Sequence, residues 1–116
     1  MFNARFKTLA SACLLTSFSL SPMQANAGDL PRYQLVIKNH KFIPAELRVI
    51  AGEKFILLID NQDNSPEEFE SHTLHREKVI PANSKGKVFI GALKPGAYPF
   101  YGEFNEDSAQ GKLIAE

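Results

Sequence analysis

The sequence predicts an all-β fold, an antiparallel Greek-key sandwich or barrel, for the part of the chain that follows residue 27. Short apolar runs rich in β-branched and aromatic residues recur along this part. Gly, Pro and Asn residues separate the runs, as turns between strands require. No run repeats its apolar positions with the period of a helix. With 116 residues, the chain fits a single domain.

The individual strands follow from these runs. The sequence YQLVIK is β-branched and aromatic, and two further strands flank the turn formed by Ala51, Gly52 and Glu53. Pro99 lies inside a predicted strand, which favours an edge or a bulge there. The least strand-like segment is NQDNSPEEFESHTLH, and we expect it to be a long acidic connection on the surface. The predicted strands cover residues 33–38, 45–50, 54–61, 75–80, 86–93, 97–104 and 111–116.

The first 27 residues are expected to be a secretory signal peptide. A positively charged start is followed by an uncharged apolar stretch at 9–20 and by small residues ahead of Gly28. The apolar stretch is too short to span a bilayer, although a retained anchor is the alternative. We therefore expect cleavage after Ala27, export to the periplasm, and a single mature domain at 28–116.

Composition narrows the function of this mature domain. The one cysteine, Cys13, would leave with the signal peptide, so neither a disulfide nor a thiolate ligand is expected. The mature chain would carry 11 basic and 13 acidic side chains, a net charge of about −2. This balance predicts no nucleic-acid partner and no basic patch for anionic lipid. No combination of a nucleophile with a base and no phosphate-binding glycine loop is present, so we do not expect an enzyme.

Several motifs in order resemble the cupredoxins. These are F-x-P-A-E-L-x-V-x-A-G at 42–52, N-x-D at 61–63, L-K-P-G-x-Y-x-F-Y at 93–101, and a final G-K-L-I. The resemblance covers nearly all of 28–116 and implies a Greek-key sandwich without direct membrane insertion after signal cleavage.

A narrower resemblance concerns PEEFESHTLHREKVI, KPGAYPFYGEF and EDSAQG, which look like the EfeO-type cupredoxin-like domains of bacterial periplasmic iron-uptake systems. This resemblance implies a role in ferrous iron uptake. The implied partners are a metal ion, a second periplasmic metal-binding protein and an inner-membrane iron permease.

The cupredoxin resemblance also assigns the four positions of a blue-copper site. Glu67 stands at the first histidine, Gly102 at the cysteine, Asn105 at the second histidine and Ala109 at the axial methionine. A type 1 copper site needs two imidazoles and a thiolate. We therefore expect no blue copper. The EfeO-type pattern usually has histidine at position 105, and an asparagine there offers an amide oxygen that suits harder cations.

A different, carboxylate-rich metal site is the alternative for iron or copper. If the fold is that of the cupredoxins, the loop that contains Glu67 and the loop at residues 102–109 meet at one end of the sandwich. On an extended strand, Glu68, Glu70 and His72 would face one way and Glu67 the other, and the sequence leaves open which set faces the site. The candidate metal ligands are Glu67, Glu68, Glu70, His72, Glu103 and Asn105.

Structural alternatives remain for these residues. Glu103 could instead bond neighbouring backbone and hold its loop in place. Arg76 could pair with Glu70 or Glu77 to form a clasp. Two functions follow from the sequence: a periplasmic component that binds or relays a metal ion, or a metal-free module that docks onto a permease or a periplasmic partner.

Overall fold

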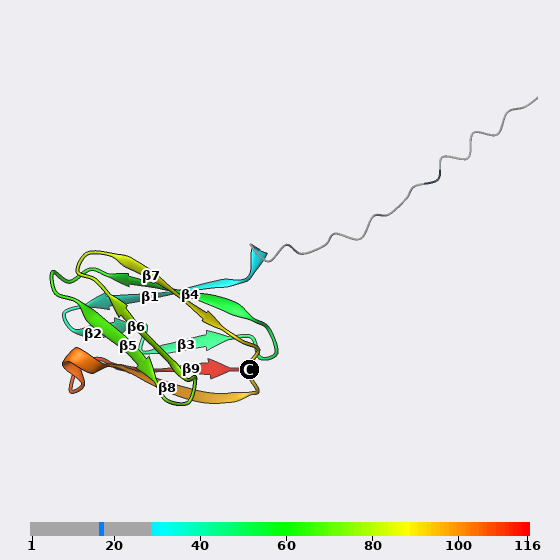
Figure 1. Cartoon of the computed structure of the whole chain (residues 1–116). Coiled ribbons are helices and arrows are strands. Elements are labelled where there is room, and N and C mark those ends of the chain that lie inside the picture. Colours follow the sequence, from blue (N-terminus) through cyan, green and yellow to red (C-terminus); the bar gives the residue numbers. More distant parts are fainter. Residues whose placement is uncertain (1–16, 18–28) are drawn as a thin grey trace, which may run out of the picture.

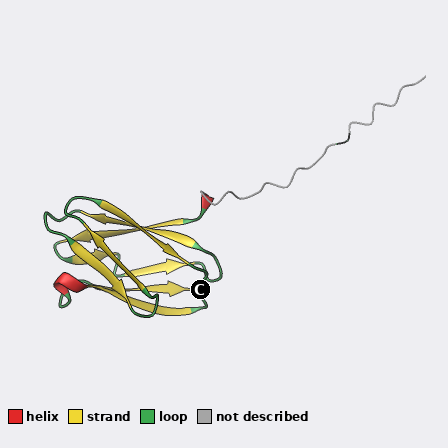
Figure 2. Ribbon diagram, viewed as in Figure 1, coloured by secondary structure: helices red, strands yellow, loops and turns green. Residues whose placement is uncertain are grey.

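The structure, a computed structural model, describes residue 17 and residues 29–116 (Figure 1). Apart from residue 17, the expected signal peptide lies outside the described residues. Two β-sheets pack face to face, and short loops join their strands (Figure 2). The predicted all-β sandwich is confirmed.

The two sheets are of unequal size. The four-stranded sheet has the order β2 (Lys41–Ile43), β1 (Arg32–Lys38), β4 (Phe55–Asn61), β7 (Lys85–Ile90). The five-stranded sheet has the order β3 (Glu46–Val49), β9 (Gln110–Ala115), β8 (Gly96–Gly102), β5 (Glu67–Ser71), β6 (Arg76–Ile80). Both sheets are mixed, because β1 pairs with β4 in parallel and β3 pairs with β9 in parallel. The parallel pairs arise because the chain visits the other sheet before it returns beside the earlier strand, so an antiparallel hairpin is not formed there.

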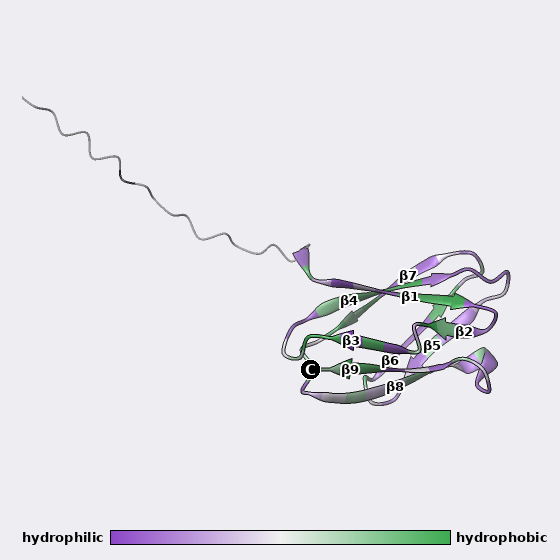
Figure 3. Ribbon diagram, turned by 180° about the vertical axis from the view of Figure 1, so that it is seen from behind, coloured by the Kyte–Doolittle hydropathy of each residue, from purple (hydrophilic) through white to green (hydrophobic). Residues whose placement is uncertain are grey.

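The core lies between the sheets and is built from alternate positions of the strands. In β4, Phe55, Leu57 and Ile59 are almost completely buried. Phe100 packs edge-on against Phe42 at a centroid distance of 5.0 Å and lies 5.2 Å from Phe69. Each buried phenylalanine contributes roughly 2–3 kcal/mol through burial. The apolar stretches lie mainly on strands, whereas the end of the sandwich that carries the short helix η2 (Glu103–Asn105) is largely hydrophilic (Figure 3).

The segment predicted as a surface connection contains a strand, so that expectation is wrong. β5 pairs with β6 at five positions and with β8 at two. Glutamate is a poor strand former, which is why propensity misses β5. The strand forms because Phe69 is buried in the core and the Ser71 hydroxyl donates a 2.7 Å hydrogen bond to the Pro99 carbonyl. Pro99 itself lies where β8 has no partner in β5, as its missing N–H requires.

A buried asparagine fixes the turn that leads into β5. The side-chain amide of Asn61 donates hydrogen bonds to the carbonyls of Ser65, Ile80 and Pro81, and its oxygen accepts one from the Asp63 N–H. Asn61 therefore ties the end of β4 to the end of β6 and holds the chain that enters β5 between them.

The described sandwich is complete within the expected mature chain. All nine strands lie between residues 32 and 115, so a fragment of residues 28–116 contains every strand and the whole core. Among the described residues, no helix combines the length and the apolar character needed to cross a membrane.

Candidate metal centre

Three glutamates converge on the outer surface of the five-stranded sheet. Glu68 and Glu70 project from the same face of β5, and Glu103 begins the single-turn helix η2 (Glu103–Asn105). One carboxylate oxygen from each lies within 4.8 Å of the other two. The helix follows β8 directly, and β8 pairs with β5, which brings Glu103 beside the two strand residues. Figure 2 shows this helix in red, at the end of the sandwich away from the C-terminus. We call Glu68, Glu70 and Glu103 the carboxylate triad.

Crowding changes the protonation of the triad. The pKa of Glu70 is raised from 4.5 to about 7, chiefly because a protonated Glu70 can donate a hydrogen bond to Glu103, and then because it is partly buried. Partial burial and the nearby Glu103 also raise the pKa of Glu68. Oε2 of Glu70 is shielded from solvent and has no hydrogen-bond partner among the described residues. Neighbouring carboxylates repel when ionised, and either a shared proton or a bound cation relieves the repulsion.

Two further residues, which were not among the sequence candidates, border the triad. Tyr101 of β8 and Glu77 of β6 both lie directly opposite Glu70 across the sheet. Burial and the charge of Glu70 raise the pKa of Tyr101. Only the strand register shows that these two residues lie beside Glu70. The register cannot be known from the sequence until the pairing of β5 with both of its neighbours is known.

Glu67 points to the other face of β5 and is bound by the protein itself. Its side chain is 2% exposed. Oε1 accepts hydrogen bonds from the N–H groups of Glu68 and Phe104, at 3.0 and 2.9 Å, and Oε2 accepts one of 2.7 Å from the Asn105 amide. We call this arrangement the Glu67–Asn105 latch. The two sets of glutamates thus lie on opposite faces of β5: Glu68 and Glu70 belong to the carboxylate triad, whereas Glu67 and Asn105 hold the loop that carries Glu103. The loop-holding role considered for Glu103 thus belongs to Glu67.

His72 borders the triad but is not one of the residues whose ligand atoms lie within 4.8 Å of one another. It begins the turn that follows β5, beside Tyr101, the residue opposite Glu70. Its Nε2 lies 3.0 Å from the Tyr101 hydroxyl, and its side chain is exposed. A shallow depression of about 240 Å³ connects its surroundings with one end of the triad, lined by Glu70, Ser71, His72, His75, Arg76 and Glu77.

The clasp considered for Arg76 is not formed within residues 29–116. The guanidinium donates instead to two backbone carbonyls, those of Phe89 at 3.0 Å and His75 at 2.9 Å. No ion pair joins it to Glu70 or Glu77 in that part of the chain. Arg76 therefore ties the edge of one sheet to the edge of the other, and it leaves the carboxylates of the triad uncompensated.

The four positions that the resemblance assigns to copper ligands do come together. Glu67 bonds Asn105, and the Gly102 N–H donates a 2.8 Å hydrogen bond to the Ala109 carbonyl. A Cβ atom placed on Gly102 would lie 2.6 Å from Cδ of Glu67 and 2.7 Å from Cβ of Ala109. These residues do not fit a blue-copper site, because they supply neither imidazole nor thiolate. The Glu67 carboxylate also lies in the space that a cysteine at position 102 would need.

Sequence comparisons match the chain to a family and to an individual protein. Residues 8–115 match the family described as "Cupredoxin-like domain". An uncharacterized protein of Rickettsia prowazekii (strain Madrid E) is 43% identical over 81 residues, which is 70% of this chain and 65% of that protein. The chain thus spans slightly less than two thirds of the length of this relative.

Solved structures agree on the fold. Auracyanin A, a "blue" copper protein from Chloroflexus aurantiacus, superimposes with a TM-score of 0.64 at 15% identity, over 73% of this chain and 98% of that one. Amicyanin from Paracoccus versutus gives 0.58 at 18% identity, over 77% and 87%. The metal-binding domain of the Streptococcus pneumoniae Cu(I)-exporting ATPase gives 0.62 at 11% identity, over 73% and 84%. At these identities the likeness establishes the sandwich alone. The family match over residues 8–115 establishes that the chain belongs to the cupredoxin-like domain family.

Proposed function

We propose that the chain is an exported, non-enzymatic component of a bacterial iron-uptake system that binds or relays a metal ion at the carboxylate triad. The observation that carries this proposal is the convergence of Glu68, Glu70 and Glu103 within 4.8 Å of one another. Three carboxylates and no thiolate favour hard divalent cations such as Fe(II) and Mn(II) over Cu(I).

The proposed cellular location and partner proteins rest on the sequence. The pattern of residues 1–27 supports export to the periplasm. The EfeO-type motifs around residues 66–80 and 94–104 support an association with an iron permease and a second periplasmic metal-binding protein. Their GEF and EEFES segments contain the three residues of the triad.

The chemistry of the triad suits transfer better than permanent storage. Glu103 is exposed, and Glu68 and Glu70 are only partly buried, so an ion could enter and leave without a large rearrangement. Because the hydrogen bond with Glu103 and partial burial raise the pKa of Glu70 to about 7, a proton would compete with the cation for this carboxylate near neutral pH. A site of this kind binds an ion with moderate affinity and releases it when the local pH falls.

Calorimetric titration of residues 28–116 with Mn(II), Cu(II) and, under anaerobic conditions, Fe(II) tests the proposal. We expect one site for Fe(II) or Mn(II) that is lost in Glu70→Gln and in Glu103→Ala. Glu46→Gln is the matched control, because Glu46 lies on the outer face of the same sheet, paired with Lys112 at 3.3 Å and away from the triad. If a folded wild-type domain gave no binding heat with any ion, or if Glu46→Gln abolished binding equally, the metal role would be wrong.

A second function, a metal-free docking module, is favoured by one specific observation. The latch closes the position that copper takes in blue-copper proteins, and Phe104 beside it is 51% exposed. A pull-down with the permease and the second periplasmic protein in the presence of a chelator distinguishes the two functions. Docking that survives both the chelator and Glu70→Gln but is lost in Phe104→Ser would favour this second function.

A further inference from the structure

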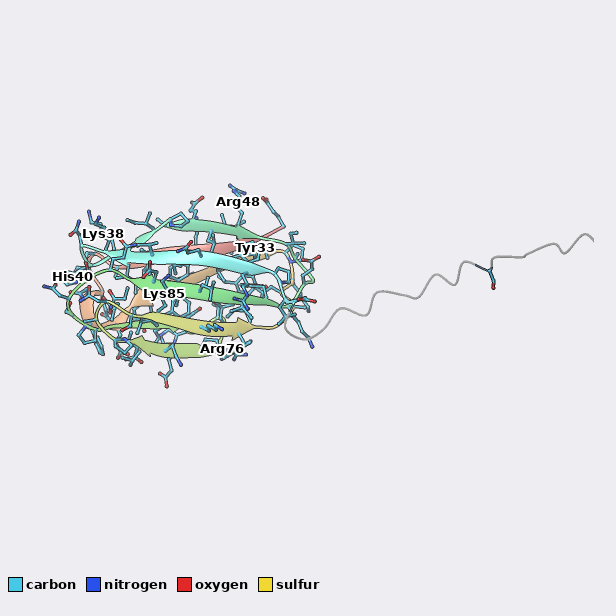
Figure 4. The ribbon with its side chains drawn as sticks, turned by 90° about the horizontal axis from the view of Figure 1, so that it is seen from above. Tyr33, Lys38, His40, Arg48, Arg76 and Lys85 are labelled. Atoms are coloured by element: carbon cyan, nitrogen blue, oxygen red, sulfur yellow. The ribbon has the colours of Figure 1, made fainter. Side chains whose placement is uncertain are left out.

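The outer face of the four-stranded sheet is basic. Leu35 and Ile37 of β1 point into the core, so the even-numbered residues of β1 point outward. The registers of β2 and β7 with their neighbours place further basic residues on the same surface. Five exposed basic side chains result, namely Arg32, Lys38, Lys41, Lys85 and Lys87. Figure 4 looks onto this surface, which we call the basic face, and labels Lys38 and Lys85.

Two carboxylates offset part of this charge. At the outward positions of the four strands the only acidic residue is Asp60, which lies opposite Lys85 and accepts a hydrogen bond of 3.1 Å from Gln62. Beyond the end of β4, the backbone hydrogen bond from His40 and, to a smaller extent, the charge of Lys38 lower the pKa of Asp63. None of the five basic side chains takes part in an ion pair within residues 29–116. The carboxylate triad lies on the outer face of the other sheet. Near-neutral composition predicts no basic patch, and that expectation is wrong for this face because the strand register separates the two signs of charge.

Two large apolar side chains share the basic face. Phe89 on β7 is 60% exposed and Ile43 on β2 is 51% exposed. They lie on the two edge strands of the sheet, so the charged residues between them are framed by apolar groups. Basic side chains together with exposed apolar ones are the combination that binds the headgroup region of an anionic bilayer.

We propose that the basic face binds peripherally to the surface of an anionic lipid bilayer. The charges are spread over three strands of an open sheet, which matches a planar array of phosphates better than a single acidic side chain in a pocket. Phe89 and Ile43 would enter the interfacial region. This orientation leaves the carboxylate triad on the side away from the lipid, open to the aqueous phase.

Vesicle co-sedimentation of residues 28–116 tests this proposal. The probe is a set of phosphatidylcholine vesicles with and without about one third phosphatidylglycerol, at low and high salt. We expect binding only to the anionic vesicles and loss of that binding at high salt. Lys85→Glu/Lys87→Glu should weaken the partition coefficient by at least ~10-fold. Lys54→Glu/Lys94→Glu is the matched control, because it makes the same charge change in exposed loops and should bind much more strongly than the first variant.

Circular dichroism and thermal melts show whether each variant is folded before it is compared. Phe89→Ser separates the apolar contribution, since it should lower the partition coefficient while leaving the salt dependence unchanged. Three results would overturn the proposal: equal binding to neutral vesicles, no binding to anionic vesicles, or equal weakening by the loop variant. Retention on an immobilised acidic polypeptide without any vesicle binding would also overturn it, in favour of an acidic protein partner.

Discussion

The side-chain amide of Asn105 donates a 2.7 Å hydrogen bond to Oε2 of Glu67, a residue 38 positions earlier in the chain. Both residues stand where the cupredoxin resemblance places copper-binding histidines. Here they bind each other instead. The residues at these positions therefore hold the loop together, and Glu68 and Glu70 of the carboxylate triad lie on the opposite face of β5.

Loss of the Glu67 carboxylate should destabilise the domain strongly. Glu67→Ala would leave the Phe104 N–H and the Asn105 amide without their acceptor in a partly buried place and would open a cavity where the buried Glu67 side chain lies. We expect the free energy of unfolding, measured by urea denaturation, to fall by about 2–4 kcal/mol. Glu68→Ala, one residue away on the opposite face, should change it little or raise it, because it relieves repulsion with Glu103. Equal losses in the two variants would contradict the latch.

Adding a side chain at Gly102 should also be costly, for a steric reason. A Cβ atom there would approach Oε1 of Glu67 to 2.8 Å and Cβ of Ala109 to 2.7 Å. Gly102→Ala should lower the free energy of unfolding by about 1–3 kcal/mol. In the double variant Glu67→Ala/Gly102→Ala, the measured loss of unfolding free energy should be smaller than the sum of the two single losses. The truncated side chain at position 67 makes room for the new methyl group. Strict additivity would show that the two side chains do not share this space.

The stability of the metal-free domain should decrease as the pH rises through the titration of Glu70. The folded pKa of about 7 lies above the ordinary value of 4.5, so the folded state holds this proton more tightly than the unfolded chain does. The contribution is fully present below about pH 4.5 and is lost as the pH approaches and passes about 7. Urea midpoints of wild type and Glu70→Gln across this range should converge at low pH and separate at high pH, where the variant is more stable. Parallel curves would contradict the raised pKa.

The titration of Asp63 should have the opposite effect on stability: the domain should become less stable as the pH falls. Its carboxylate accepts hydrogen bonds from the N–H groups of His40 and Asn39, at 3.0 and 2.8 Å, and the His40 bond is the main reason that the pKa of Asp63 is lowered. This contribution is present above its ordinary value of 3.8 and is lost as the pH falls. Compared with Asp63→Asn, the wild type should lose its advantage on acidification below about pH 4. An advantage that persists unchanged would show that the charge of Asp63 does not stabilise the loop.

Much of the fold can be predicted from alternation and turn residues, as β1, β4, β7, β8 and β9 show. β5 cannot, because EEFES carries polar side chains on both faces and its stability comes from bonds to residues far along the chain. The parallel pairing of β1 with β4 and of β3 with β9 is not predictable for the same reason, since it depends on where the chain returns after it crosses between sheets.

The site was partly predictable. Strand alternation correctly puts Glu68 and Glu70 on one face, and the resemblance brings the loop of Glu103 to the same end. His72, which the same alternation places beside them, contacts Tyr101 opposite Glu70 but lies in the turn that follows β5, outside the cluster of three carboxylates. Asn105 was a candidate ligand, and the structure uses its amide as a hydrogen-bond donor to Glu67. The contact between Asn105 and Glu67, 38 residues apart in the chain, shows that Asn105 has a structural role, and the sequence alone does not reveal this contact.

Anomalous diffraction from crystals of residues 28–116 soaked in manganese chloride would test the central claim most directly. The account predicts a single strong peak within coordination distance of carboxylate oxygens of Glu68, Glu70 and Glu103, absent from Glu70→Gln crystals. A peak enclosed by Glu67 and Asn105 would contradict the latch. It would place the metal site at the positions that the cupredoxin resemblance assigns to copper ligands. No peak on the triad at a saturating metal concentration would contradict the proposed metal-binding role.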